Sequence, residues 1–280
     1  MPHAAIPAEM FKAVRGGHWA DDHSAAQGVS LDEVREAVLE QPYWSAPGQE
    51  GTTLVYGLTS AGRHLLVVVI ADDEEAFVVT ARDMKESWDD SYTGETPPPW
   101  DIGRPQPVFV RLADEGRLGG RVLDAGCGTG EHALLAASRG ADAIGVDLSP
   151  TAIALAKAKA AKRGLSARFE VADALDLPRQ ALTVDTVIDS GVFHIFDDED
   201  RAKYVAGLAA VLRPGGTWYL MCFSDKQPGD WGPRRFSAAE LHSWFSSGWA
   251  IESLTAEPFD LNLINGLTQV QAWLAVIRRR

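Results

Sequence analysis

Apolar and polar positions follow two different patterns along the chain. In the first part, a capping box at Ser30 and Glu33 starts an amphipathic helical pattern that Pro42 ends. Three runs rich in β-branched residues follow, at 52–60, 63–71 and 76–82, separated by short polar turns. This pattern predicts a helix followed by a three-stranded antiparallel meander. We therefore expect residues 1–85 to form a small α+β domain.

From Val108 onward, strand and helix patterns alternate. Strands are expected at 121–126, 143–148, 167–173, 183–191 and 217–224, and helices at 130–140, 149–164 and 198–216. Two last strand patterns, 249–257 and 270–279, suit antiparallel strands at the end of the chain. Such alternation requires crossover connections, and it predicts an α/β fold with a doubly wound, Rossmann-like and mostly parallel sheet over residues 108–280.

The connecting segment, 86–107, has another composition. It contains three consecutive prolines at 97–99, which exclude a regular helix or a central strand. Trp88, Tyr92 and Trp100 favour a lid over a site rather than a bare linker, because linkers seldom carry so many aromatic side chains.

A glycine-rich loop follows the first strand of the α/β part. Gly126, Gly128 and Gly130 stand between a strand and a helix, as a nucleotide-binding turn requires. Asp124 precedes the loop, where its charge would repel a pyrophosphate but would suit a ligand that carries an ammonium group. Asp147 ends the next strand, and Asp173 ends the one after it. Because the carboxyl ends of parallel strands form one edge of the sheet, these carboxylates are expected to meet at a ligand site.

The stretch from Val122 to Ala160 resembles the cofactor-binding half of class I S-adenosylmethionine-dependent methyltransferases. The resemblance extends over about residues 86–280 and implies that S-adenosylmethionine is the cofactor. It further implies that the acid before the loop places the amino group, the second acid takes the ribose hydroxyls and the third region holds the adenine. The cofactor-binding residues implied or inferred at this edge are Trp100, Asp124, Gly126, Cys127, Gly128, Gly130, Asp147, Leu148, Asp173, Ala174, Asp189 and Ser190.

Methyl transfer needs in-line attack by a nucleophile, and the protein mainly positions the reactants and excludes water. The segment after the fourth strand is expected to face the methyl group, and His194 is its one base candidate at neutral pH. His194 would act as a base or would only pack or cap the next helix. The candidate substrate-binding residues are Tyr92, Phe193, His194, Phe196 and Arg234. The two phenylalanines also suit a core, and Arg234 also suits a solvated surface.

Segments 97–107 and 222–241 are similar to small-molecule methyltransferases related to thiopurine and heterocyclic-toxin methylating enzymes. This resemblance implies a small-molecule acceptor, with thiol, phenolic oxygen and aromatic nitrogen all open as the attacking atom. A different class of function is a nonenzymatic module that senses S-adenosylmethionine, which would bind the cofactor without turnover.

Composition narrows the partners. The formal net charge of −13 argues against nucleic acid, because phosphate binding depends on Lys and Arg. The apolar runs are too short to cross a bilayer, and the N-terminus lacks the apolar segment of a signal peptide, so a cytoplasmic protein without membrane contact is expected. Cys127 and Cys222 have no paired ligand spacing, so no metal is expected. A homodimer stays open, because a dimer interface need be no more apolar than other surface.

Residues 28–85 resemble the BrnT-type toxins, which are small ribonuclease-like domains of toxin–antitoxin pairs. The resemblance rests on the element pattern and on the short motifs at 59–63 and 80–84. It implies RNA cleavage by basic residues, here Arg63, His64 and Arg82. Residues 1–85, however, hold six basic against thirteen acidic residues, a net charge of −7 that suits phosphate poorly. We expect a domain that docks, dimerises or helps to cover the acceptor, with ribonuclease activity as the alternative.

Overall fold

The structure is a computed structural model of residues 1–280 that describes residues 11–16, 28–40, 42–47, 51–61, 63–72, 74–83, 88–94, 96–229, 232–264 and 266–280. The chain divides into two compact units. Unit 1 contains residues 1–90 with the short segments 229–233 and 264–266, and unit 2 contains the remainder. The division at Asp90 and Ser91 lies inside the segment that the sequence marks as a lid or linker. In the described part, no helix is long and apolar enough to cross a membrane.

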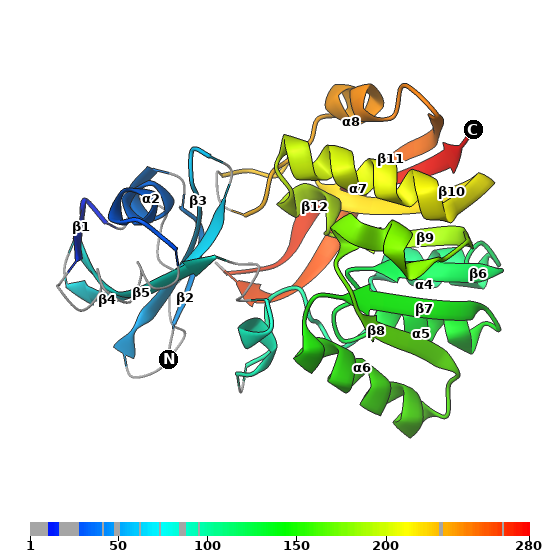
Figure 1. The fold of residues 1–280 in the computed structure, drawn as a ribbon, viewed down its shortest axis with the longest axis horizontal. Coiled ribbons are helices and arrows are strands. Elements are labelled where there is room, and N and C mark those ends of the chain that lie inside the picture. The colour runs from blue at the N-terminus through cyan, green and yellow to red at the C-terminus, as the bar shows by residue number, and fades with distance from the viewer. Residues whose placement is uncertain are drawn as a thin grey trace. The chain divides into compact units, whose positions relative to one another are not determined.

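Unit 1 is a five-stranded sheet with a short helical segment (Figure 1). Its strands, in the spatial order β1-β5-β4-β3-β2, are β1 Ala13–Gly16, β5 Glu75–Asp83, β4 His64–Asp72, β3 Thr53–Leu58 and β2 Pro42–Pro47. The antiparallel meander β3-β4-β5 is confirmed. The prediction of only three strands is wrong, because β2 pairs antiparallel with β3, and β1 pairs parallel with β5. Pro42 thus ends the helix and also starts a strand at the sheet edge, where a missing N–H is tolerated.

The predicted helix begins at the expected cap. Ser30 accepts a hydrogen bond from the Glu33 N–H at 3.2 Å, and the Glu33 carboxylate accepts one from the Ser30 N–H at 2.8 Å. Helix α2 (Leu31–Arg35) continues into a π-helical turn, η1 (Glu36–Glu40). Val34, Ala37 and Val38 are buried there against the sheet in a core of their own.

Unit 2 contains a seven-stranded sheet in the order β11-β12-β10-β9-β6-β7-β8. Its strands are β6 Arg121–Ala125, β7 Asp142–Asp147, β8 Ala167–Val171, β9 Val184–Ser190, β10 Leu212–Phe223, β11 Trp249–Ile264 and β12 Leu267–Arg279. The neighbours from β8 to β10 are parallel, and β12 is antiparallel to β10. The prediction of a doubly wound α/β sheet is therefore confirmed.

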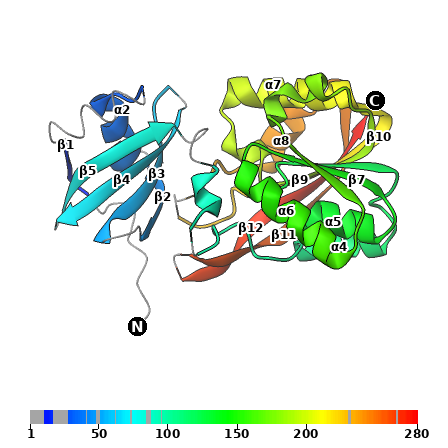
Figure 2. The same ribbon diagram turned by 60° about the horizontal axis from the view of Figure 1, so that its bottom comes forward.

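Helices cover both faces of this sheet (Figure 2). Helices α4 (Pro107–Asp114), α5 (Glu131–Ser138) and α6 (Pro150–Arg163) lie on one face, and α7 (Asp198–Val211) and α8 (Ala238–Trp244) lie on the other. Helix α6 has the predicted Ser149 cap and ends at Gly164 in the left-handed conformation. Helices α4 and α8 were not predicted, although Ser237 and Glu240 form a capping box at the start of α8 that the sequence displays.

The strand order reverses at β6. The chain continues from β6 to β7 on one side, while β9 pairs with β6 on the other side. The loops that follow β6, β7 and β9 therefore begin at the same carboxyl edge. Such a switch point is where open α/β sheets bind their ligands.

Candidate functional site

The glycine loop joins β6 to α5 at this switch point. Gly128 and Gly130 have φ angles of +52° and +86°, which residues with a Cβ atom rarely adopt. A Cβ atom on Gly130 would lie 2.7–2.8 Å from atoms of Phe169 and Ala156. The loop thus needs glycine both for its backbone conformation and for the close approach of helix to sheet.

Asp124 is fixed by the helix that follows the loop. One carboxylate oxygen, Oδ2, accepts a hydrogen bond from the Ala133 N–H at 2.9 Å, one of the first N–H groups of α5. The other oxygen, Oδ1, is buried and has no hydrogen-bond partner among the described residues. Burial raises the pKa of Asp124 to about 7, and the charges of Asp147 and Asp189 also raise this pKa.

Asp147 and Asp173 end the next two strands. Asp147 accepts hydrogen bonds from the Gly128 N–H at 2.8 Å and from the Ser149 N–H at 2.9 Å, so it joins the glycine loop to the start of α6. Asp173 caps the following turn, η4 (Ala174–Gln180), through the Leu175 N–H at 2.8 Å. Leu148 beside Asp147 is 37% exposed, which makes it an apolar side chain open at this edge.

The aromatic segment before α4 lies directly on the glycine loop. The Tyr92 hydroxyl, in the short helix η3 (Asp90–Tyr92), is 2.9 Å from the position that a Cβ atom on Gly128 would take, and it accepts a hydrogen bond from Trp100 Nε1 at 2.9 Å. Burial raises the pKa of Tyr92 well above its ordinary value, so its hydroxyl stays protonated. Thr129 donates to Asp101 at 2.9 Å. The segment is thereby tied to the loop at two points.

The turn after β9 adjoins the same loop. A Cβ atom on Gly126 would lie 2.1 Å from a methyl group of Val192, so the two turns are in direct contact. Asp189 shapes this turn by accepting hydrogen bonds from the N–H groups of Val192 and Phe193 and from the Tyr204 hydroxyl, at 2.8, 3.2 and 3.0 Å. Burial raises the pKa of Asp189 to about 7.

His194 lies in the single turn η5 (Phe193–Ile195). Its Nδ1 accepts a hydrogen bond from the Phe223 N–H at 3.0 Å, and its Nε2 faces Gly191, where a Cβ atom would be 3.2 Å away. The ring is 4.8 Å from the Phe223 ring and 6.5 Å from the Phe259 ring. Because Nδ1 accepts, the neutral imidazole carries its proton on Nε2. In this tautomer the ring offers a hydrogen-bond donor and not a base.

Sequence comparison finds a methyltransferase domain over residues 122–216. The 2-heptyl-1-hydroxyquinolin-4(1H)-one methyltransferase of Mycobacteroides abscessus is 37% identical over 181 residues, which cover 61% of this chain and 80% of the relative. This chain belongs to the S-adenosylmethionine-dependent methyltransferases. The demethylmenaquinone methyltransferase of Thermus thermophilus is 39% identical over 114 residues, which cover 40% of this methyltransferase and 51% of the relative.

Two solved structures have the fold of this methyltransferase. One, from a study of the conversion of a disulfide bond into a thioacetal group during echinomycin biosynthesis, has a TM-score of 0.63 and 42% identity, and the match covers 70% of this chain and 93% of that one. A SAM-dependent methyltransferase from Anabaena variabilis has a TM-score of 0.57 and 21% identity with the same coverage, and it shows the fold alone.

The residues at the switch point fit S-adenosylmethionine. The buried Oδ1 of Asp124, which lacks a partner within the described part of the chain, suits the ammonium group of the methionine portion. The carboxylate of Asp124 already accepts one of the first N–H groups of α5, and its negative charge at this helix start disfavours a phosphate. The methyltransferase cofactor therefore agrees with the geometry of this edge.

Three of the predicted site residues lie elsewhere in the methyltransferase than expected. Phe193 is fully buried in the core against Trp218 and Phe236, so it is a core residue rather than a wall of an acceptor pocket. Asp189 is fully buried, and its oxygens accept hydrogen bonds from the turn and from the Tyr204 hydroxyl of α7, so it is a structural acid beneath the turn rather than an exposed residue of the cofactor side. Arg234 pairs with the carboxylates of two neighbouring acids, Asp198 and Glu240, which corrects the expectation of a cation available to an acceptor.

Sequence reasoning missed residues that reach this edge from far along the chain. Phe223 and Phe259 lie on β10 and β11 and pack on each other at 5.6 Å beside His194. Gln106 holds both the N–H and the C=O of Asp260, at 2.8 and 2.9 Å, and so ties the segment before α4 to β11. A signal for Phe223 existed, because it belongs to the strand pattern predicted at 217–224, whereas Phe259 lies in a part of β11 beyond the pattern predicted at 249–257. Nothing local indicated that those strands meet here.

Proposed function

We propose that this methyltransferase transfers the methyl group of S-adenosylmethionine to a small heteroaromatic molecule that bears an acidic hydroxyl group. The observation that carries the proposal is the turn after β9. This turn contacts the glycine loop through Val192, and its His194 packs beside Phe223 and Phe259, at 4.8 and 6.5 Å between ring centroids. A flat acceptor suits ring-lined walls. The named substrate of the Mycobacteroides abscessus relative, a hydroxyquinolinone, supports hydroxyl oxygen over thiol sulfur or ring nitrogen as the attacking atom.

S-adenosylmethionine supplies an electrophilic methyl group when it is bound. We propose that Asp124 binds the amino group and Asp147 the ribose hydroxyls, with Leu148, Asp173 and Ala174 around the adenine. The glycine loop with Cys127 would approach the methionine and ribose portion, and Tyr92 and Trp100 would cover it. This assignment places Tyr92 on the cofactor side rather than on the acceptor side, because its hydroxyl lies over Gly128.

We propose that His194 donates a hydrogen bond from Nε2–H to the acceptor and orients it for attack. An acidic hydroxyl or a thiol ionises without help from the protein, so a base is not required. Phe196, half-buried beside Tyr204, would border the acceptor from the end of the same turn.

The test of the acceptor class is turnover of labelled S-adenosylmethionine to S-adenosylhomocysteine. The panel contains a 1-hydroxyquinolin-4(1H)-one, the same ring without the hydroxyl, simple phenols, thiols and N-heterocycles. We expect turnover that depends on the hydroxyl of the heteroaromatic ring. Turnover confined to thiols would reject the acceptor class while leaving methyl transfer intact. Cofactor binding without turnover on the whole panel would favour the sensing module.

Substitutions of His194 test its role as a donor. Glutamine keeps an N–H donor, so His194→Gln should retain most of kcat/KM for the acceptor, whereas His194→Ala should lose roughly tenfold to a hundredfold. If His194 is instead a base, both variants should lose activity equally, and the acidic limb of the wild-type pH–rate profile should disappear in both.

We infer that residues 1–85 form a BrnT-like domain without ribonuclease activity, which docks or dimerises. Arg63 supports this inference, because its guanidinium bonds to the Glu33 carboxylate at 2.5 Å and to the Gly28 carbonyl. The side chains of His64 and Arg82 lie outside the described residues. The full chain should therefore leave a structured RNA intact, and sedimentation velocity should separate a monomer from a dimer. Cleavage of the RNA by wild type that is lost in Arg63→Ala would reverse the inference.

The proposed location of this methyltransferase is the cytoplasm, which the free, buried cysteines support.

A further inference from the structure

Arg201, in the first turn of α7, is a fully buried cation. Its guanidinium lies over the rings of Phe236, Phe193 and Trp244, at 4.8, 5.2 and 5.2 Å from their centroids. Removing the guanidinium of an arginine from water is unfavourable unless its N–H groups form hydrogen bonds, so the partners of Arg201 show what this buried charge holds in place. Burial lowers the pKa of Arg201 to about 10, and the side chain therefore keeps its charge at neutral pH.

The donors of Arg201 bond to the backbone on both sides of His194. Nε donates to the Phe193 carbonyl at 3.1 Å, and Nη2 donates to the Phe196 carbonyl. Nη1 donates to the Asp198 carboxylate at 2.5 Å. One rigid, planar group thus holds the two carbonyls that enclose residues 194 and 195, a task for which the fork of arginine is suited.

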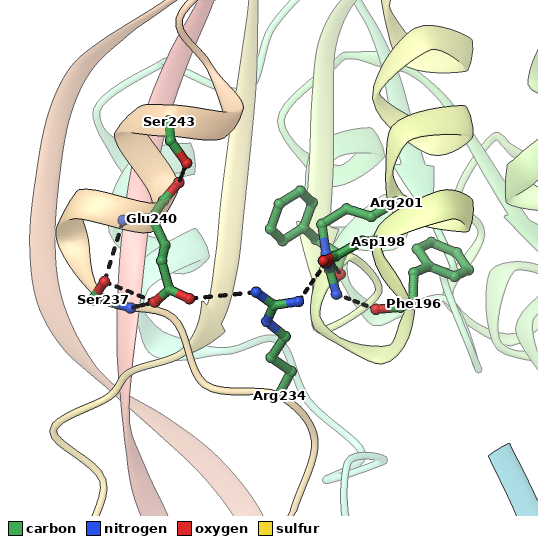
Figure 3. A network of polar contacts seen from close by, with 8 residues as sticks. Phe196, Asp198, Arg201, Arg234, Ser237, Glu240 and Ser243 are labelled. Carbon is green, nitrogen blue, oxygen red and sulfur yellow. Dashed lines mark hydrogen bonds and ion pairs between the residues drawn. The ribbon is translucent and has the colours of Figure 1, made fainter. Parts of the chain in front are cut away.

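The Asp198 carboxylate also belongs to a network of ion pairs that reaches helix α8 (Figure 3). Asp198 Oδ1 also pairs with Arg234, which reaches Glu240 at 3.4 Å. Glu240 accepts a hydrogen bond from the Ser237 N–H at 2.8 Å in the cap of α8. The figure shows this chain of alternating charges crossing from α7 to α8. Two acids therefore balance two arginines, and Arg201 is the member of this network that is buried.

The turn that carries His194 is fixed at its start by Asp189, which accepts hydrogen bonds from the Val192 and Phe193 N–H groups, whereas the carbonyls of Phe193 and Phe196 are held by Arg201. Within η5, the Ile195 N–H bonds to the Val192 carbonyl at 3.1 Å, and a three-residue turn of this kind is too short to fix its own orientation. We propose that Arg201 is a positioning residue for His194, because it holds the Phe193 and Phe196 carbonyls and so keeps Nδ1 on the Phe223 N–H and Nε2 toward Gly191. The importance of this role for turnover rests on the proposed donor function of His194.

The experiment compares Arg201→Lys and Arg201→Met with wild type and with Arg278→Lys. Methionine is a flexible apolar side chain that fills the aromatic surroundings without a buried charge, and the Asp198 carboxylate that loses this partner is exposed and still pairs with Arg234. Arg278 is a matched control, because it also bonds a carboxylate and a backbone carbonyl, those of Glu252 and Gly215. Near-ultraviolet circular dichroism reports folding, and nitrogen-15 NMR of the imidazole reports the tautomer, with the His194 signal assigned from His194→Gln.

We expect both Arg201 variants to shift the His194 ring from the single Nε2–H tautomer to a mixture. Their kcat/KM for the acceptor should fall by about tenfold to a hundredfold, while the Kd for S-adenosylhomocysteine stays within about twofold of wild type. Arg278→Lys should change none of these. Lysine should recover less than half of the loss seen with methionine, because it cannot hold two carbonyls in one plane.

An unchanged tautomer in folded Arg201 variants would overturn the proposal. If neither variant folds, Asp198→Asn provides the deciding measurement, because the Asp198 side chain is exposed and the loss of its charge weakens the ion pairs to Arg201 and Arg234 without opening the core. A measurable shift of the His194 tautomer in Asp198→Asn supports the proposal. The absence of any shift in this variant overturns the proposal. If His194→Ala leaves turnover unchanged, the donor function fails, and the tautomer measurement still tests the positioning.

Discussion

At the residue scale, the burial of Asp124 has a consequence for stability. Its ordinary pKa of 3.8 is raised to about 7 by burial, so the folded state holds the proton more tightly than the unfolded state does. The contribution of Asp124 to the free energy of unfolding therefore falls as the pH rises from about 4 to about 7, and it levels off above that range. The same carboxylate, when ionised, is the group that suits an ammonium ligand.

The substitution Asp124→Asn separates these two effects. Asparagine keeps an acceptor for the Ala133 N–H but carries no charge, so the free energy of unfolding should exceed that of wild type by roughly 1–3 kcal/mol at pH 8 and by less at pH 6. The Kd for S-adenosylmethionine should rise by about tenfold or more. Chemical denaturation at both pH values and calorimetric titration measure the two effects. A variant that binds the cofactor as tightly as wild type would remove Asp124 from the site.

A pH dependence of cofactor binding follows from the same residue. An ammonium group beside Asp124 favours the ionised carboxylate, so binding should release a proton near pH 7 and weaken as the pH falls toward 6. Calorimetric titration in two buffers of different ionisation enthalpy counts that proton. Wild type should show the release and Asp124→Asn should not; equal proton counts in both would assign the release to another group.

At the element scale, the junction of β6, the glycine loop and α5 depends on Gly130. Alanine there would combine an unfavourable positive φ with contacts under 3 Å to Phe169 and Ala156, and we expect a loss of roughly 2–5 kcal/mol. Gly140 is the matched control, because its φ is +87° but nothing lies within 4 Å of a Cβ atom, so Gly140→Ala should lose only about 1 kcal/mol. Thermal unfolding compares them, and equal losses would show that crowding at Gly130 is unimportant.

The sequence predicted helices and loops best where interactions between neighbouring residues define them. The caps of α2 and α6 and the loop after β6 were predicted to within a residue or two, since capping and positive φ depend on neighbours in the chain. Strand β1 was missed because only its parallel pairing with β5, about sixty residues away, makes it a strand. Helix α8 was missed despite its capping box, because the aromatic residues around it gave no clear helical period.

At the scale of the whole molecule, the two units have separate apolar cores. A ligand that binds only the folded form of one unit stabilises that unit by mass action, by about 2.7 kcal/mol at a hundredfold excess over Kd. We expect calorimetric scanning of the full chain to show two transitions, of which S-adenosylhomocysteine raises only the one that belongs to unit 2. A single transition that moves as a whole would mean that the two cores unfold together.

The sequence by itself determined the strand ends and the glycine loop at the switch point of this methyltransferase, because the strands, the loop and the acids that end each strand are encoded within about fifty consecutive residues. Tertiary structure decided the acceptor side. Phe193 and Arg234 were candidates for the acceptor side that also suited a core and a surface, and the fold placed one in the core and the other in ion pairs. Phe259 reaches His194 across 65 positions of sequence. Contacts at such separations exist only after the sheet has formed, so no local pattern can record them.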